Sequence, residues 1–257
     1  KRLKGFQLIL EVEEVFYLDD RNPVDVRRRG LEDALIAAAD QYIFASDLLA
    51  NRFSAGKDFA VVYGGYTIPP RIAQRRMDGN IHVVYAGGID SLRRVDYAVK
   101  AFGLLPDGFR LHILGKGADQ ELERLRLEIE KVNCEAGYEK AEYVGCLYGR
   151  EYDAYLESCH IGLNMQSIGS SIEDVAYPSK ISSYMGRGLT VVSGRLSSVV
   201  ASPFAATMQM YNASTPEEIA QAILTCKIQD YDTQTRMVFE AEKRFMTELE
   251  RILSIGR

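Results

Sequence analysis

The strongest constraint on the fold is a regular alternation between short apolar runs and segments with helical periodicity. From about residue 78 to residue 230, β-rich runs end in turns, and most are followed by apolar residues three or four positions apart. Strands that alternate with helices in this way are typical of a parallel α/β sheet. We therefore predict an α/β fold with a Rossmann-like parallel sheet and helices on both faces.

The elements of this sheet can be placed from their apolar spacing. Strands are expected over 81–85, 109–114, 141–144, 161–165 and 189–193, and helices over 92–102, 122–132, 151–158, 178–186 and 215–226. Pro178 is expected at the first position of its helix, where proline is favoured. Thr215 followed by Pro216 and Glu218 forms a capping box, which predicts a helix start at this point.

The first 77 residues are also α/β, but they hold too few strands for a complete doubly wound domain. Strands are expected over 7–14, 42–45 and 59–63, with helices over 31–39 and 46–53, and glycine and proline between residues 64 and 80 indicate a linker. We predict a partial domain over 1–77, a Rossmann-like domain over 78–232 and a closing helix over 233–257. Because the chain begins at Lys1 without Met, we expect a piece of something longer.

Composition excludes several classes of function. The chain has 257 residues and a net charge of -5, which argues against a dedicated nucleic-acid binder. No stretch approaches the roughly 20 apolar residues of a membrane-spanning helix. Four cysteines lack CxxC spacing and three histidines lie far apart in sequence, so we predict a cytoplasmic protein with reduced thiols and no metal site.

Two glycine turns follow predicted strands, at the end of the sheet where ligands bind in such folds. Gly87 and Gly88 let backbone approach a ligand near a helix N-terminus. Arg93 and Arg94 are expected in the first turn of that helix, where cations oppose the dipole, so a bound phosphate would explain them. The alternative is a tight turn with solvated arginines. The second turn, around Lys116, is either a similar site or a plain turn.

A third cluster surrounds the start of the helix near Pro178. Two carboxylates, Glu173 and Asp174, precede a phenol at Tyr177 and a lysine at Lys180. A helix N-terminus attracts anions, so this arrangement fits an anionic ligand. The alternative is that the acids cap their own helix.

The order of these motifs resembles the nucleotide-sugar-binding C-terminal domain of retaining GT-B glycosyltransferases, the group that includes glycogen-synthase-like and bacterial polysaccharide transferases. The most specific motif is YPSKISSYMGRGLTVV over 177–192, which is similar to the family block YPSKxxEYMAxGxPVV. The segments 84–89, 113–117 and 143–147 resemble the family's strand ends. The resemblance covers nearly the whole chain, and residues 9–14 and 42–46 look like the end of the family's N-terminal domain.

The resemblance implies a set of donor-binding residues. They are Gly87, Gly88, Arg93, Arg94, Gly115, Lys116, Cys146, Leu147, Tyr177, Pro178, Ser179, Lys180 and Ser183. Among them, the glycine turn and Arg93 would hold the diphosphate, the loop 177–180 would hold the diphosphate and sugar, and the loop 145–148 would face the base. The family often has arginine where this chain has Gly88, so that contact is missing or comes from Arg94.

The sequence departs from the family at its two glutamates. Ser183 stands at the position that usually meets the ribose, and a neutral hydrogen bond there is about half as strong as a charge-assisted one. Val175 stands at the other position, where Glu173 or Asp174 could substitute. Glu13 falls roughly where relatives place a histidine or acid facing the cleft, which makes it a candidate acid/base or, alternatively, an exposed strand end.

The function implied is retaining transfer of a hexose-type sugar from a UDP- or GDP-linked donor to a glycan or lipid-linked acceptor, in polysaccharide or glycoconjugate biosynthesis. No cofactor or metal is implied, and the piece alone could bind a donor without transferring it. The alternatives are a non-catalytic partner protein with a degenerate site and a nucleotide-sugar epimerase. Basic runs at 27–29 and 71–76 suit peripheral contact with the inner membrane surface or simple solvation.

Overall fold

The larger of two sheets dominates the fold. The computed structural model describes residues 6–15, 23–168 and 176–254, without the side chains of 23–28. Within these residues a six-stranded parallel sheet has the order β6-β5-β4-β7-β8-β9. Its strands are β4 (Ile81–Ala86), β5 (Phe109–Leu114), β6 (Ala141–Gly145), β7 (Ile161–Asn164), β8 (Thr190–Gly194) and β9 (Gln209–Tyr211). The predicted α/β class with a Rossmann-like sheet is confirmed.

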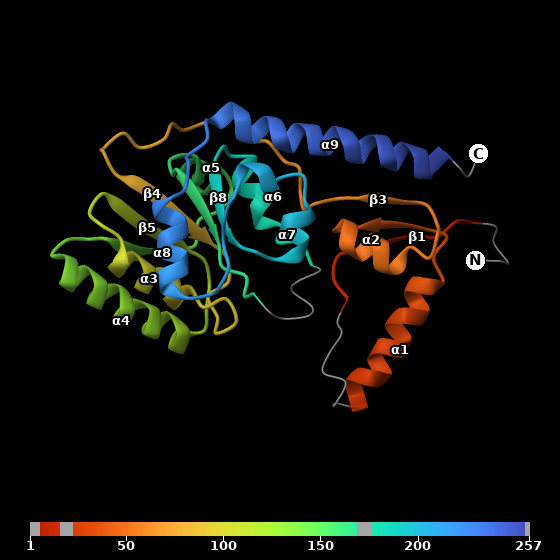
Figure 1. Cartoon of the computed structure of the whole chain (residues 1–257), viewed down its shortest axis with the longest axis horizontal. Helices are drawn as coiled ribbons and strands as arrows, with labels where there is room; N and C mark the ends of the chain where they lie inside the picture. The colour runs from red at the N-terminus through yellow and green to blue at the C-terminus, as the bar shows by residue number, and fades with distance from the viewer. Residues whose placement is uncertain (1–5, 16–22, 169–175, 255–257) are drawn as a thin grey trace.

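Helices cover both faces of this sheet because side chains alternate along each strand. Val83 of β4 packs in one core and its neighbour Val84 in the other. The first core is covered by α3 (Val95–Leu104), α4 (Asp119–Ala136) and α8 (Pro216–Leu224). The second is covered by α5 (Gly149–Glu157), α6 (Lys180–Met185) and α7 (Ser197–Ala201), as Figure 1 shows.

A smaller parallel sheet of order β1-β2-β3 precedes the larger one in the chain. It comprises β1 (Ile9–Val12), α1 (Pro23–Ala37), β2 (Gln41–Phe44), α2 (Asp47–Phe53) and β3 (Phe59–Val61). Its buried side chains belong to the same apolar cluster as α6 and β8. The two sheets therefore share one continuous core on that side.

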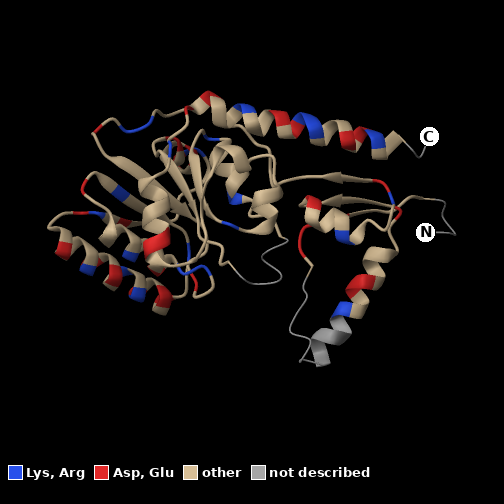
Figure 2. Ribbon diagram, in the orientation of Figure 1, with Lys and Arg blue, Asp and Glu red and all other residues tan. Residues whose placement is uncertain are grey.

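The C-terminal helix α9 (Tyr231–Ser254) runs from the larger sheet back along the smaller one (Figure 1). Near its start it packs on α6, and near its end on β3. Glu248 accepts a hydrogen bond from the backbone N–H of Val61 at 3.0 Å, and Arg251 forms a 2.7 Å ion pair with Asp58. Charged residues of both signs recur along α9 and α4 (Figure 2), and no described helix is long and apolar enough to cross a membrane.

Two helix starts differ from the sequence predictions. Helix α3 begins at Val95 rather than near Leu92. The Asp90 side chain accepts hydrogen bonds from the backbone N–H groups of Leu92 and Arg93, which holds this segment in a turn. Arg94 then adopts a left-handed φ of 47°, which is incompatible with a helix. Arg93 and Arg94 therefore precede the helix. Pro178 lies before α6, whose N-cap is Ser179.

The predicted cap of α8 is confirmed, with one change. The Thr215 hydroxyl accepts from the N–H of Glu218 at 3.3 Å, and Pro216 is the first helical residue. The Glu218 carboxylate, however, accepts from the N–H of Asn212 at 3.2 Å rather than from Thr215. Glu218 thereby ties the end of β9, a strand absent from the predicted set, to the start of α8.

Candidate functional site

The candidate site lies where the strand order reverses. Consecutive strands β4, β5 and β6 run toward one edge of the sheet, whereas β7 returns to the other side of β4. The loops after β4 and β7 therefore diverge, and such a switch point leaves a crevice at the carboxyl ends of the strands. Ligands of open α/β sheets bind in this crevice.

A pocket of about 390 Å³ opens at this end of β4, β5 and β6. It is lined by six of the predicted donor-binding residues: Gly87, Gly88, Gly115, Lys116, Cys146 and Leu147. Ala86, Leu114, Tyr148 and Tyr152 complete the lining. The structure thus brings together the glycine turns after β4 and β5 and the loop after β6.

The two glycine turns pack directly against each other. Gly115 has a φ of 145°, and a Cβ there would overlap the carbonyl oxygen of Gly87. A Cβ on Gly117 would stand 2.5 Å from the carbonyl oxygen of Ile89, whose N–H donates to Lys116 at 2.7 Å. Glycine is needed here so that the backbones can approach closely. The floor of the pocket is therefore backbone.

Lys180 extends from the start of α6 to Gly87, one of the residues that line this pocket. Its ammonium lies so close to Gly87 that a Cβ at Gly87 would overlap it. The ammonium is 3.3 Å from the Tyr85 hydroxyl and 4.4 Å from the centre of the Tyr85 ring. Among the described residues no carboxylate lies within ion-pair distance of it. Burial, assisted by Arg93 and opposed by Asp90, lowers the pKa of Lys180 to about 8.

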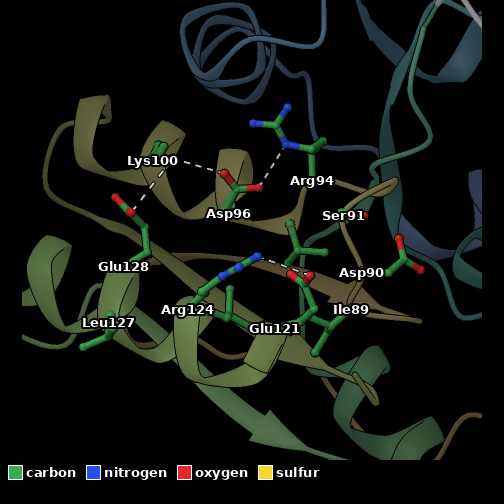
Figure 3. Close-up of a pocket in the computed structure, with 12 residues that line it drawn as sticks. Ile89, Asp90, Ser91, Arg94, Asp96, Lys100, Glu121, Arg124, Leu127 and Glu128 are labelled. Carbon is green, nitrogen blue, oxygen red and sulfur yellow. Dashed lines mark hydrogen bonds and ion pairs between the residues drawn. The ribbon is translucent and has the colours of Figure 1, made fainter. Parts of the chain in front are cut away.

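Arg93 and Arg94 point in different directions. Arg93 forms an ion pair with Asp90 beside Gly88. Arg94 instead stacks over the Tyr97 ring at 3.6 Å and lines a separate pocket of about 420 Å³ between α3 and α4 (Figure 3). The structure therefore places Arg93, and not Arg94, beside the glycine turn.

Ser183 is held next to the pocket by a network that sequence reasoning missed. Its hydroxyl accepts a hydrogen bond from Arg187 at 3.0 Å, and Arg187 also donates to Asp153 at 2.8 Å. The Arg187 guanidinium lies 5.5 Å from the ring of Tyr152, which lines the pocket. Arg187 occupies a variable position of the 177–192 motif, so the motif gave no signal for it.

The remaining residues of the predicted loop have mixed placements. The Tyr177 ring is buried edge-on against Tyr63 at 5.0 Å, and burial raises the pKa of its hydroxyl far above the ordinary value. Pro178 is buried as well, whereas Ser179 is exposed. Tyr177 therefore joins the two sheets, and Ser179 and Lys180 are the residues of this loop that remain accessible.

None of the three candidate acids, Glu13, Glu173 and Asp174, is found at the pocket in the part of the chain that the structure describes. Glu13 is exposed just after β1 and lines a shallow pocket of about 440 Å³ against α1. Glu173 and Asp174 lie outside the described residues, as does Val175.

Comparison with known proteins places the fold. No protein-family model matches the chain, and no curated protein matches it in sequence. Among solved structures it is similar to HepE of Anabaena in complex with UDP, with 14% identity, a TM-score of 0.67, and coverage of 97% of this chain and 71% of that one.

Two further solved structures are similar. Trehalose-6-phosphate synthase OtsA has 11% identity, a TM-score of 0.64, and coverage of 99% of this chain and 68% of that one. The lipopolysaccharide outer core galactosyltransferase WaaB has 14% identity, a TM-score of 0.63, and coverage of 88% and 66%. The chain has the fold of GT-B glycosyltransferases, and at these identities the likeness concerns the fold alone.

Proposed function

We propose that this chain binds a nucleotide-sugar donor at the carboxyl end of the larger sheet and acts within a retaining glycosyltransferase. The observation that carries the proposal is the partly buried ammonium of Lys180, set at the glycine turn with no carboxylate partner among the described residues. A buried cation without a counter-ion favours an anionic ligand. HepE, which shares the fold, was solved with UDP and with UDP and glucose.

We expect the diphosphate, the base and the ribose of the donor to contact different parts of the site. The diphosphate would lie over the turn of Gly87 and Gly88, between Lys180 and Arg93. The base would enter the pocket beside Leu147 and Tyr148. As the glycosidic bond breaks, negative charge grows on the diphosphate, and a preorganised ammonium stabilises that charge without reorganisation. The transferred sugar would be of hexose type, and the acceptor a glycan or a lipid-linked molecule.

The expected ribose contact is weaker than in the family pattern, which has a glutamate at the position of Ser183. Ser183 offers a hydroxyl that is already engaged by Arg187. A neutral hydrogen bond contributes about 1 kcal/mol, roughly half of a charge-assisted one. We therefore expect donor affinity in the micromolar range or weaker, with UDP or GDP as the nucleotide.

Calorimetric titration with UDP, GDP and ADP tests the proposal. One nucleotide should bind with a Kd below about 1 mM, and Lys180→Ala should weaken it at least about tenfold, or 1.4 kcal/mol. Arg94→Ala is the matched control, because Arg94 faces the other pocket and its loss should leave the Kd unchanged. Equal binding by the Lys180 variant would remove the site assignment.

A second candidate is a non-catalytic protein that retains donor binding. The observation in its favour is the neutral, engaged Ser183 in a pocket that otherwise keeps its lining. A transfer assay with radiolabelled UDP-glucose, run on the longest natural form of the protein, separates the two. Binding with neither transfer nor hydrolysis would support the second candidate.

A further inference from the structure

All three histidines of the chain meet in one stack, away from the donor pocket. His82 lies at the amino end of β4, His112 in β5 and His160 just before β7. The rings of His82 and His112 stack with centroids 5.0 Å apart, and His160 stacks on the other face of His82 at 5.8 Å. His82 and His112 are buried. Strand pairing brings together residues that are 30 or more positions apart in sequence.

The ring nitrogens of His82 and His112 form a chain of contacts that fixes their protons. The outer nitrogens face carboxylates: Nε2 of His82 is 3.0 Å from Asp78, and Nδ1 of His112 is 2.6 Å from Glu142. An ionised carboxylate only accepts, so both outer nitrogens carry hydrogen. The inner nitrogens, Nδ1 of His82 and Nε2 of His112, lie 2.7 Å apart.

The guanidinium of Arg76 sits over this inner gap. Its Nη1 is 2.8 Å from the inner nitrogen of His112 and 3.2 Å from that of His82. Arginine only donates hydrogen bonds, so in the neutral pair both inner nitrogens accept from Arg76. The Tyr155 ring, 4.9 Å from the guanidinium, holds it from the side.

Arg76 belongs to the segment 71–78, which connects the smaller sheet to the larger one. Its backbone N–H donates to Ser158 at 3.0 Å, and the N–H groups of Ile72 and Ala73 donate to Glu157 at 2.8 and 2.7 Å. Arg75 donates to the carbonyl of Gly188 at 2.6 Å. This basic run is thus fastened to the larger sheet, where Arg75 and Arg76 are both engaged.

We propose that His82, His112 and Arg76 form a proton-sensitive latch on this connecting segment. A proton taken up from solvent between the two inner nitrogens makes a His82–His112 hydrogen bond. One of those nitrogens then donates to the other, so the shared site that accepted from Arg76 is lost. Uptake of one proton therefore displaces the guanidinium and loosens the segment 71–78.

The direction of the pH effect follows from burial. Burial lowers the pKa of His82 below 6.5, and the nearby charges of His112 and Arg76 act in the same direction, while Asp78 opposes them. A histidine whose pKa is lowered on folding stabilises the fold above its unfolded value and loses that contribution as pH falls. The latch is therefore closed above pH 6.5 and opens below it.

The surrounding groups leave this window to the histidine pair. Burial and Arg75 lower the pKa of His160 to about 4, so His160 stays neutral above that pH. The hydrogen bond from His112 holds the pKa of Glu142 at about 2, and Asp78 is likewise held low by His82. The other acid facing the stack is Glu139, and the other basic groups are Arg110 and Lys140. The Lys140 ammonium donates to the carbonyl of Leu105.

Burial raises the pKa of Tyr155 above its ordinary value and that of Cys159 to about 12, so neither titrates in the window.

The latch can be tested on the full chain by nuclear magnetic resonance. Three histidines give three resolvable ring signals, and nitrogen shifts should report Nε2–H on His82 and Nδ1–H on His112 at pH 7.5. Amide exchange should show protection of Arg76 falling below pH 6.5, by up to about tenfold for each pH unit until the midpoint of the His82 signal is reached, as one-proton linkage requires. Constant protection between pH 8 and 5, or the opposite tautomers, would overturn the latch.

Two neighbouring variants distinguish a latch from simple packing. Arg76→Gln should raise the midpoint of the His82 signal by about one pH unit or more, because a cation in contact is removed. Arg75→Gln should move the His160 signal and leave the other two in place. A third readout is Met77→Trp, since the chain has no tryptophan and Met77 is 93% exposed. The fluorescence of this tryptophan should change with pH at the same midpoint as the His82 signal. If Arg76→Gln leaves that midpoint unchanged, the proposal is contradicted.

Discussion

Each end of the larger sheet holds a basic side chain beside an aromatic ring, but the two cations differ in how many hydrogen-bond partners they have. At the amino end, the Arg76 guanidinium is matched by two ring nitrogens and an aromatic face. At the carboxyl end, Lys180 has an aromatic face and a phenol, but no described carboxylate. A cation that is fully matched within the fold contributes stability, whereas one left unmatched at a pocket is available to a ligand. Arg76 and Lys180 carry the same charge, so the number of hydrogen-bond acceptors around each one is what distinguishes them.

The largest loss of stability is expected at the glycine turns, where the two backbones approach too closely to admit a side chain. Gly115→Ala should lower the free energy of unfolding by more than about 3 kcal/mol, because the new Cβ combines a strained φ with overlap of Gly87. Urea denaturation measures the change. Gly137→Ala is the matched control, since Gly137 has a φ of 77° but open space around it, and it should cost about 1 kcal/mol. Equal losses would mean that close approach of the two turns is unimportant.

A smaller loss of stability is expected at the amino end. Arg76→Met should lower the free energy of unfolding by about 2 kcal/mol at pH 7.5, because two ring nitrogens lose their donor. Arg71→Met, which removes a cation stacked on Tyr231, should cost less than about 1 kcal/mol. Thermal or urea unfolding of both variants at the same pH gives the comparison, and similar losses would remove the contrast between the two ends.

The pH dependence of donor binding should identify the carboxyl-end cation. Since the pKa of Lys180 is lowered to about 8 and the ammonium is the binding form, affinity for UDP should fall above pH 8. The fall should approach about tenfold, or 1.4 kcal/mol, for each pH unit. Calorimetry between pH 7 and 9.5 measures it. In Lys180→Met the slope should be absent, and a slope that survives the substitution would point to a different group.

The smallest effect is expected for the stability of the unliganded protein without Lys180. Lys180→Met should change the free energy of unfolding by less than about 0.5 kcal/mol, or raise it, because a desolvated ammonium is replaced by an apolar chain of similar length. Urea denaturation in the absence of nucleotide is the measurement. A loss of about 2 kcal/mol would show that Lys180 is as well matched as Arg76, and the distinction between the two ends would fail.

Much of the larger sheet was predictable because its strands and helices carry strong local signals. Alternation of apolar runs with helical periodicity located five of the six described strands of the larger sheet. The glycine turns located four residues of the pocket, and the family resemblance added Cys146 and Leu147. Strand β9 was missed because three residues carry too little pattern. The turn before α3 was missed because the Asp90 side chain and the left-handed Arg94 set it, and neither has a periodic signal.

Contacts between segments that are distant in the sequence were the features that could not be predicted. The histidine stack depends on the register that pairs β4 with β5 and β7, which no single strand encodes. The hold of Arg187 on Ser183 depends on Asp153 from a different helix. Such networks are set by tertiary packing, so a sequence read segment by segment supplies their members but not their partners.

The path of the chain between its two sheets has a mechanical consequence. The chain leaves the smaller sheet through residues 64–80 and returns along it as α9, where Arg251 and Glu248 fix the helix to β3. The two sheets also share one continuous apolar core, so a displacement of one sheet against the other would separate packed side chains and strain both connections.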